Sequence, residues 1–386
     1  MNDLETLSMQ PKEIGIGLLG YGFAAKAYVN ALKTIPHMIW PPPAVPKLVS
    51  ICGTQEGPLR TAAKRYGFKR YTASWKELVT DPEVELFINA GPNNLHAEPC
   101  LAAVKVGKHV LCEKPLARSA DEAKQMWEAV KEAPIRNFCG FNYRFVPAIR
   151  LAKEMIDSKV LGRIYQFRAQ YLQDWAMDAP YGWRFDREIA GSGVVGDIGA
   201  HIVDLARFLI GEIESVTATT STFIKERWGA ECSERRKVNI DDGFAAVVQF
   251  DNGVIGVFEA SWVCAGHKNY LAFEVSGEKG SIAFNLEDLN VLNVYQISDE
   301  KGMQGFRRVL VTEKEHPFCN VWWSSGHVLG WEHAHVHLIW HVLEAIAKSK
   351  DIKPYGATFE DGYKCAVICD AILHSASEKT WIKIQY

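Results

Sequence analysis

The stretch that decides the fold is EIGIGLLGYGFAAKAYVNAL, residues 13–32. Its first seven residues form an apolar run that stops at glycines, which is typical of a buried strand. Residues 24–32 then predict a helix, and the turn between the two elements holds Gly20, Gly22, Phe23 and Ala24. Small residues in such a turn let backbone amides approach a phosphate at the positive end of the helix. The pattern G-x-G-x-x-A therefore predicts a dinucleotide-binding loop if a βαβ unit surrounds it.

Strands and helices alternate through the rest of the first 140 residues. Between the first helix and the second strand, the Pro-rich segment 35–46 is expected to be non-helical, because proline lacks an amide donor and fixes φ. The alternation predicts a parallel sheet with helices on both faces and ligands at the carboxyl ends of its strands. The further strands are expected at 48–52, 85–90, 109–112 and 135–140, and the further helices at 58–66, 99–106 and 119–132.

The pattern changes after residue 142, where long alternating stretches replace the short apolar runs. They predict an open, mainly antiparallel sheet, because turn signals such as Asp-Asn-Gly at 251–253 join them. We therefore expect an α/β protein with a dinucleotide-binding domain, 1–142, and an α/β substrate-binding domain, 143–386, whose last helix packs back on the first domain. Its strands are expected at 164–171, 215–223, 244–250, 254–259, 270–276 and 280–284, and its helices at 146–158, 197–209, 332–348 and 359–377.

Composition excludes several classes of protein. The chain has 386 residues, 48% of them hydrophobic and 23% charged, as in globular proteins of two or three domains. The net charge of −3 argues against a nucleic-acid groove or a polybasic membrane contact. The nine cysteines include no CxxC pair, so a reducing compartment is expected. Neither a signal peptide nor a membrane span is read from the sequence, and a cytoplasmic location is expected.

Three titratable residues are placed where they can perform chemistry. Lys114 directly follows the strand 109–112, beside the expected cofactor crevice, although a lone lysine there is often a solvated turn residue. Asp197 and His201 are four residues apart on a predicted helix and share one face, although Asp197 could simply be the N-cap. Together the three suit alcohol oxidation: histidine takes the hydroxyl proton, lysine bonds the same oxygen, and the carboxylate orients the substrate or the imidazole.

The end of the second strand bears on the choice of cofactor. It reads Cys52-Gly53-Thr54-Gln55, without the carboxylate that holds the ribose hydroxyls in many NAD enzymes. Thr54 and Arg60 could hold a 2′-phosphate, but Arg60 is as readily a solvated helix residue. We therefore expect NAD or NADP, with a slight lean to NADP or dual use.

The histidine-rich segment EHAHVH, 332–337, suggests a metal site at first sight. Of its three histidines only His333 and His337 have helical i, i+4 spacing, and no Cys or carboxylate obviously completes a zinc site. We expect no metal, and we expect His335 to line a substrate pocket instead.

Four blocks of the chain resemble the glucose–fructose oxidoreductase / inositol dehydrogenase (Gfo/Idh/MocA) family: residues 15–27, 90–117, 141–156 and 191–211. YLQDW at 171–175, WRF at 183–185 and the Pro-rich segment look most like a sugar-dehydrogenase branch of it. The resemblance implies a Rossmann domain, then an α/β domain whose open sheet mediates homodimer or homotetramer contacts. It implies that NAD(P) is bound by the glycine loop and by the turn holding Asn93 and His96. It also implies that Lys114, Asp197 and His201 are catalytic, with His201 as acid/base.

The resulting prediction is an NAD(P)-dependent enzyme that oxidises a secondary hydroxyl of a sugar or cyclitol, or reduces the corresponding ketone. Alternatives are an NAD-dependent glycosidase that uses transient oxidation, and a catalytically silent cofactor-sensing regulator. Of the 12 tryptophans, nine follow residue 143, and aromatic planes suit the apolar faces of sugars. The expected cofactor residues are Gly20, Gly22, Phe23, Ala24, Gly53, Thr54, Pro92, Asn93, His96, Glu113 and Lys114. The expected substrate residues are Tyr143, Arg144, Gln173, Trp175, Trp183, Arg184 and His335.

Overall fold

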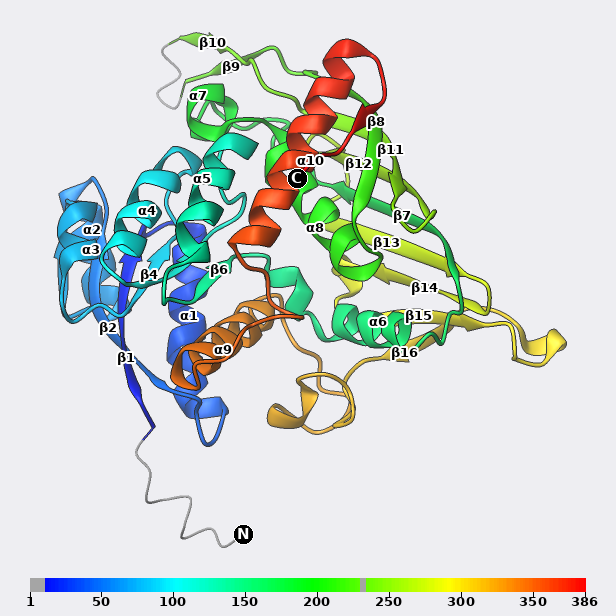
Figure 1. The fold of residues 1–386 in the computed structure, drawn as a ribbon, viewed down its shortest axis with the longest axis horizontal. Helices are drawn as coiled ribbons and strands as arrows, with labels where there is room; N and C mark the ends of the chain where they lie inside the picture. The colour runs from blue at the N-terminus through cyan, green and yellow to red at the C-terminus, as the bar shows by residue number, and fades with distance from the viewer. Residues whose placement is uncertain (1–10, 230–233) are drawn as a thin grey trace, which may run out of the picture.

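Two large sheets organise the part of the chain that the computed structural model describes, residues 11–229 and 234–386 (Figure 1). The first sheet has six strands in the order β3-β2-β1-β4-β5-β6, and every neighbouring pair is parallel. The second has nine strands in the order β16-β15-β14-β13-β7-β12-β11-β8-β17. The predicted α/β architecture, a parallel sheet followed by a large mainly antiparallel one, is confirmed.

The first sheet is built from the predicted alternation of strands and helices. The turn chemistry is local: the Ser119 hydroxyl caps the first turn of α5, and Gly67 ends α2 in the left-handed region at φ 80. Two short elements, β3 and α3, were not predicted, since three and six residues carry too little periodicity. The elements are β1 (Glu13–Leu19), α1 (Phe23–Met38), β2 (Val45–Cys52), α2 (Glu56–Tyr66), β3 (Arg70–Thr72), α3 (Trp75–Thr80), β4 (Leu86–Asn89), α4 (Ala97–Lys105), β5 (His109–Cys112), α5 (Ala120–Lys131) and β6 (Asn137–Cys139).

The prediction that residues 35–46 are wholly non-helical is wrong. Helix α1 continues through Pro36 to Met38, and the Ile39 amide still bonds the Ile35 carbonyl at 3.0 Å. Proline removes a single bond when it sits in the last turn, and burial of Ile35 against the sheet offsets that loss. Strand β2 also begins three residues earlier than expected, with Pro46 paired opposite Ile14 of β1.

The second sheet has one covered and one open face. Helices α6 (Pro147–Asp157), α8 (Ala200–Leu209) and α10 (Phe359–Glu378) pack on one side, and Figure 1 shows the other side free of described helices. Only β7 and β12 pair in parallel. Its strands are β7 (Ile164–Leu172), β8 (Ile213–Ser221), β11 (Gly243–Phe250), β12 (Ile255–Ser261), β13 (Tyr270–Gly277), β14 (Gly280–Asn285), β15 (Val291–Gln296), β16 (Arg307–Leu310) and β17 (Ile382–Lys383); β9 (Glu226–Trp228) and β10 (Arg235–Lys237) form a separate ribbon.

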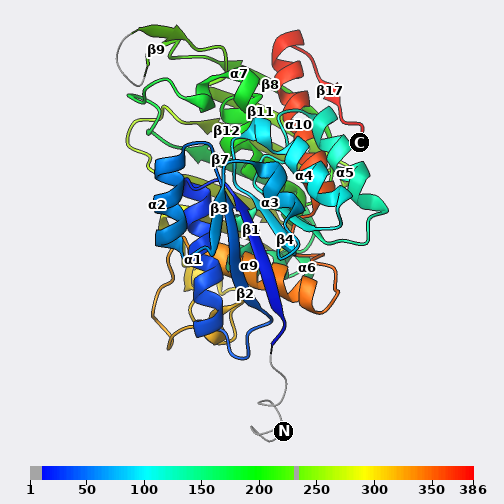
Figure 2. The ribbon, with the colours of Figure 1, turned by 90° about the vertical axis from the view of Figure 1, so that its left-hand side faces the viewer.

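Two late helices join the sheets. Helix α9 (His333–Ala347) packs on α1 and shares a core with the first sheet, so this part of the chain returns to the first sheet (Figure 2). Helix α10 contacts both α5 and strand β8. The two sheets are therefore joined by segments that are distant in sequence.

One stretch, Arg187–Leu209, is long and apolar enough by composition to cross a membrane, but 83% of its most apolar window is buried inside the protein. It includes α8 and serves as a core segment.

The eight described cysteines are all free thiols. Cys232 and residues 1–10, where the sequence predicts no signal peptide, lie outside the described residues.

Candidate active site

A cavity of about 930 Å³ lies where the carboxyl ends of β1, β4 and β5 meet α8 and the end of β7. It brings the glycine loop together with all three predicted catalytic residues. The predicted residues that line it are Gly20, Gly22, Phe23, Ala24, Gly53, Thr54, Pro92, Asn93, Glu113, Lys114, Tyr143, Gln173, Trp175, Trp183, Arg184, Asp197, His201 and His335. His96 and Arg144 do not line it.

The glycine loop fits a pyrophosphate. Gly20 has φ +100, and a Cβ there would lie 2.5 Å from the Ala90 carbonyl oxygen. At Gly22 a Cβ would project into open space, and no side chain caps the amides of the first turn of α1. The positive end of a 16-residue helix therefore faces the cavity uncovered, as a dinucleotide phosphate requires.

His96, predicted to bind the cofactor, does not line the cavity but contacts two loops that do. Its Nδ1 lies 2.8 Å from the Pro115 carbonyl oxygen and its Nε2 lies 3.1 Å from the Gly91 carbonyl oxygen. Burial lowers the pKa of His96, and because both oxygens only accept, the neutral ring donates a hydrogen bond to one of them and lies against the other. The side chain thus ties the turn after β4 to the turn after β5, which carries Lys114.

Glu113 lines the cavity beside Lys114 and is itself buried. Its carboxylate accepts hydrogen bonds from the Tyr28 hydroxyl and, at 3.1 Å, from the Lys114 amide. Burial raises the pKa of Glu113. These bonds fix the turn from which the Lys114 side chain extends.

Lys114 and Asp197 form the charged centre of the site. Lys114 Nζ lies 2.7 Å from Asp197 Oδ1 and 3.1 Å from the Asp197 carbonyl oxygen, and Arg184 Nε lies 3.6 Å from Asp197 Oδ2. Burial by itself raises the pKa of Asp197, but the two cations outweigh it and hold that pKa at about 2. Asp197 is therefore an anion throughout the neutral range, and it fixes the ammonium group of Lys114.

Asp197 lies in a π-helical turn, Val195–Gly199, which runs directly into α8. It is not an N-cap, because its carboxylate is used by Lys114 and Arg184. The turn is held from outside: the Asp241 carboxylate accepts from the Gly193 and Val195 amides at 2.8 and 2.7 Å.

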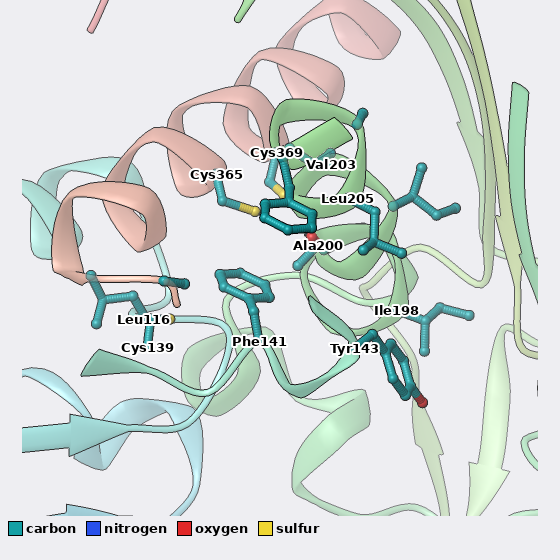
Figure 3. Packing of buried hydrophobic residues seen from close by; sticks show 14 of the residues in the cluster. Leu116, Cys139, Phe141, Tyr143, Ile198, Ala200, Val203, Leu205, Cys365 and Cys369 are labelled. Atoms are coloured by element: carbon teal, nitrogen blue, oxygen red, sulfur yellow. Dashed lines mark hydrogen bonds between the residues drawn. The ribbon is translucent and has the colours of Figure 1, made fainter. Parts of the chain in front are cut away.

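The outer side of α8 is also held by α10. Figure 3 shows Cys365 and Cys369 of α10 packed against this segment, and Cys365 Sγ lies 3.4 Å from the Ala200 carbonyl oxygen. Phe141 lies in the same apolar cluster (Figure 3), and its ring lies 6.1 Å from the His201 ring, centre to centre. The backbone that carries Asp197 and His201 is thus packed on both sides.

His201 is 6% exposed and its ring lies 4.5 Å from the Tyr143 ring, centre to centre. No described protein group hydrogen-bonds its ring nitrogens, so they are available to a ligand. Burial, and next the charge of Lys114, lower the pKa of His201 well below its usual value of 6.5. The imidazole is neutral at pH 7, which is the form that a general base needs.

The far wall of the cavity is aromatic and polar. Trp175 and Trp183 line it as predicted, and the Arg184 guanidinium lies 4.3 Å from the centre of the Trp183 ring. The lining residues that sequence reasoning missed include Tyr171, Lys268, Asn269 and Trp331. Asn269 reaches the wall because β13 pairs with β7 in a register that sets Tyr270 opposite Leu172. Only knowledge of that pairing would have revealed it.

Arg144, predicted to bind substrate, is a buried structural residue. Its Nη2 lies 2.6 Å from Asp204 of α8 and 3.2 Å from Asp361 of α10. The ion pair between Arg144 and Asp204 fixes α8 about one turn after His201. Arg144 therefore positions α8, which carries His201, and does not line the cavity.

Replacing Arg144 should destabilise the fold strongly. Arg144→Met leaves two buried carboxylates without their main cation, and breaking such a pair costs about 3–5 kcal/mol. The free energy of unfolding, measured by denaturant titration, is expected to fall by that amount. Lys348→Met is the matched control, because the Lys348–Glu344 pair lies at the surface, where a pair is worth less than about 1 kcal/mol. Equal losses in both variants would contradict the assignment.

His333 and His337 form hydrogen bonds with separate neighbours, and Nδ1 of His335 is buried without a described partner. His337 Nε2 accepts from Trp322 Nε1 at 2.7 Å, and its Nδ1 lies 2.9 Å from the Phe145 carbonyl oxygen. His333 contacts the backbone of Gly330. Only His335 lines the cavity.

Two family models match the chain. The model of the oxidoreductase family with an NAD-binding Rossmann fold matches residues 14–141, and that of the GFO/IDH/MocA C-terminal domain matches residues 149–283.

Individual relatives agree with the family models. Levoglucosan dehydrogenase from Pseudarthrobacter phenanthrenivorans (strain DSM 18606 / JCM 16027 / LMG 23796 / Sphe3) is 38% identical over 97% of this chain and 98% of its own. A solved levoglucosan dehydrogenase, in complex with NADH and levoglucosan, superposes with a TM-score of 0.93 at 39% identity, covering 97% of this chain and 100% of the other. D-xylose 1-dehydrogenase (NADP(+)) 2 from Haloferax volcanii is 28% identical over 70% of this chain and 77% of its own.

Proposed function

The chain belongs to the GFO/IDH/MocA family of oxidoreductases, and from this premise we propose that it oxidises a secondary hydroxyl of a cyclic sugar or cyclitol with a nicotinamide dinucleotide. One observation carries the proposal. Lys114, Asp197 and His201 converge in the cavity that the glycine loop also lines. Its relatives named levoglucosan dehydrogenase and D-xylose 1-dehydrogenase support the substrate class.

The geometry divides the reaction among three side chains. The bound nicotinamide supplies the acceptor for the hydride that leaves the carbinol carbon. Neutral His201 takes the hydroxyl proton on a ring nitrogen, and the Lys114 ammonium donates a hydrogen bond to the same oxygen as negative charge develops there. Asp197 holds Lys114 in place, and its second oxygen, beside Arg184, is available to a neighbouring substrate hydroxyl.

The test is a panel of pyranoses and cyclitols, each assayed with NAD and with NADP for formation of the reduced cofactor. The expected result is turnover with a subset of the panel, and stabilisation of the protein by the same compounds in thermal unfolding. Glycoside cleavage without net cofactor reduction would overturn the proposal in favour of a glycosidase. Cofactor binding with no turnover of any compound would overturn it in favour of a regulator.

We propose that the cavity accepts both NAD and NADP. The lining residues after β2, Gly53 and Thr54, are uncharged, and Arg60 does not line the cavity. Gly53 and Thr54 carry no charge that would attract or repel a 2′-phosphate. The relatives differ in their cofactor: one is solved with NADH and another is named for NADP(+). We expect kcat/KM for the two cofactors to differ by less than about tenfold, which corresponds to ~1.4 kcal/mol. A preference above about a hundredfold would contradict this reading.

We further propose that the chain forms a homodimer or homotetramer through the open face of the second sheet. Val247 of β11 lies opposite Val257 of β12, with Ile255 near them, and all three are between 38% and 50% exposed. Exposed apolar residues gathered on one face are typical of an interaction surface. The mass in solution, measured by light scattering, tests the proposal.

We place the protein in the cytoplasm. The free thiols of all eight described cysteines support a reducing compartment. Localisation of a tagged chain tests this placement.

A further inference from the structure

A chain of hydrogen bonds along the substrate wall has an indole at each end. At one end, Trp175 Nε1 lies 2.8 Å from Gln173 Oε1, and Gln173 Nε2 lies 2.7 Å from Asn269 Oδ1. An indole N–H only donates, so the atom of Gln173 that faces Trp175 must be its carbonyl oxygen. The Gln173 amide nitrogen therefore faces Asn269, and the atom of Asn269 that receives it must be an oxygen.

The rest of the chain follows from that oxygen. Tyr171 Oη lies 2.7 Å from Asn269 Oδ1, and a carbonyl oxygen only accepts, so the Tyr171 hydroxyl donates to it. Tyr143 Oη lies 2.8 Å from Tyr171 Oη and must donate in turn, since the single Tyr171 proton is used. Trp331 Nε1 donates to Tyr143 Oη at 3.3 Å and closes the other end. Burial raises the pKa of Tyr171, so its hydroxyl keeps this proton across the neutral range.

The hydrogen bonds that run from the two indoles meet at Asn269 Oδ1 and leave Asn269 Nδ2 free. Asn269 Oδ1 accepts two hydrogen bonds and has no lone pair left. Its amide nitrogen carries two hydrogens and donates to no described protein group, although Asn269 lines the cavity. The backbone is fixed as well, because Glu287 Oε1 accepts from the Lys268 and Asn269 amides at 2.9 and 2.8 Å. The wall thus offers a pre-oriented donor at Asn269 Nδ2.

We propose that Asn269 is a specificity-determining residue whose amide donates to an acceptor-only oxygen of the substrate, a ring or bridging ether oxygen of a cyclic sugar. A substrate hydroxyl at this place would also need an acceptor for its own proton. The adjacent Asn269 Oδ1 cannot serve, because it already accepts two hydrogen bonds. An ether oxygen has no such proton. This inference rests on the proposed function and deepens it: the ether oxygen separates sugars from carbocyclic polyols.

The experiment compares two substrates in two enzymes. The substrates are the best pyranose of the panel and its carbocyclic analogue, in which a CH₂ group replaces the ether oxygen. Asn269→Asp is nearly isosteric: one oxygen keeps the bonds from Tyr171 and Gln173, and the other replaces the donor with an acceptor. Wild type is expected to prefer the sugar by at least about tenfold in kcat/KM, because the analogue leaves the Asn269 donor unpaired. In Asn269→Asp the preference should disappear or reverse, because a carboxylate oxygen repels an ether oxygen.

Three controls separate the possible failures. Asn30→Asp makes the same charge change on the exposed side of α1 and should keep the wild-type preference. The dissociation constant of NADH should be unchanged in Asn269→Asp, which reports an intact fold. Trp175→Phe removes the indole donor that orients Gln173, and it should weaken the preference for the sugar. Because the Trp175 side chain is 41% exposed, this variant should still fold.

An unchanged preference in both Asn269→Asp and Trp175→Phe would overturn the inference while leaving the proposed function intact. Absence of turnover with every compound in the wild-type enzyme would instead overturn the proposed function, and this inference with it.

Discussion

His201→Ala is expected to lower kcat by about 10²–10⁴-fold, the usual contribution of a general acid–base group. The ring of His201 is neutral and buried, no described protein group bonds its nitrogens, and Lys114 and Asp197 lie beside it in the same cavity. Removing it leaves the substrate hydroxyl without a proton acceptor. The glycine loop lies elsewhere in the cavity, so the dissociation constant of NADH, measured by fluorescence titration, should stay within about twofold of wild type.

The matched control is His374→Ala, since His374 is an exposed histidine on α10. It should retain wild-type kcat. If His201→Ala kept kcat within a factor of about ten of wild type, His201 would not be the base.

Lys114→Met should lower kcat by about 10²–10³-fold and also move the pH profile. The first effect is the loss of a donor to the developing oxyanion. The second follows from charge: Lys114 lowers the pKa of His201, so removing it must raise that pKa. Oxidation needs neutral His201, and activity falls as pH drops through the pKa of that residue. The acidic limb of kcat/KM should therefore lie at higher pH in Lys114→Met than in wild type.

The profile is measured for both enzymes between about pH 5 and pH 8, the range in which histidines titrate. Lys105→Met, which removes an exposed lysine of α4, is the control and should leave the limb in place. A limb that stayed fixed in Lys114→Met, or moved to lower pH, would contradict the electrostatic coupling between Lys114 and His201.

Local patterns predicted the fold and most of the residues that line the cavity. The glycine loop, Lys114 and the pair Asp197/His201 each sit where an element begins or ends, and the end of an element is readable from a few neighbouring residues. The cavity confirms that they come together. The alternation of strands and helices predicted the parallel sheet for the same reason.

Two of the misses, Arg144 and Asn269, share a cause, which is that their surroundings depend on distant segments. Arg144 looks like a site residue beside Tyr143, but its partners Asp204 and Asp361 are 60 and 217 residues away. Asn269 enters the wall only through the register of β13 on β7. His96 is in a predicted cofactor-binding turn by sequence, yet its ring lies between the carbonyl oxygens of Gly91 and Pro115 and does not line the cavity.

The central claim is that hydride passes from a sugar carbon to the nicotinamide, with His201 as base. The most direct measurement uses the best substrate of the panel, deuterated at the carbon that bears the reacting hydroxyl, in a reaction with the oxidised cofactor. Mass spectrometry of the reduced cofactor is predicted to find one deuterium per molecule, carried on the nicotinamide ring, and His201→Ala should form this product far more slowly. Deuterium released to water, or a cofactor that remains oxidised while the sugar is consumed, would contradict the account.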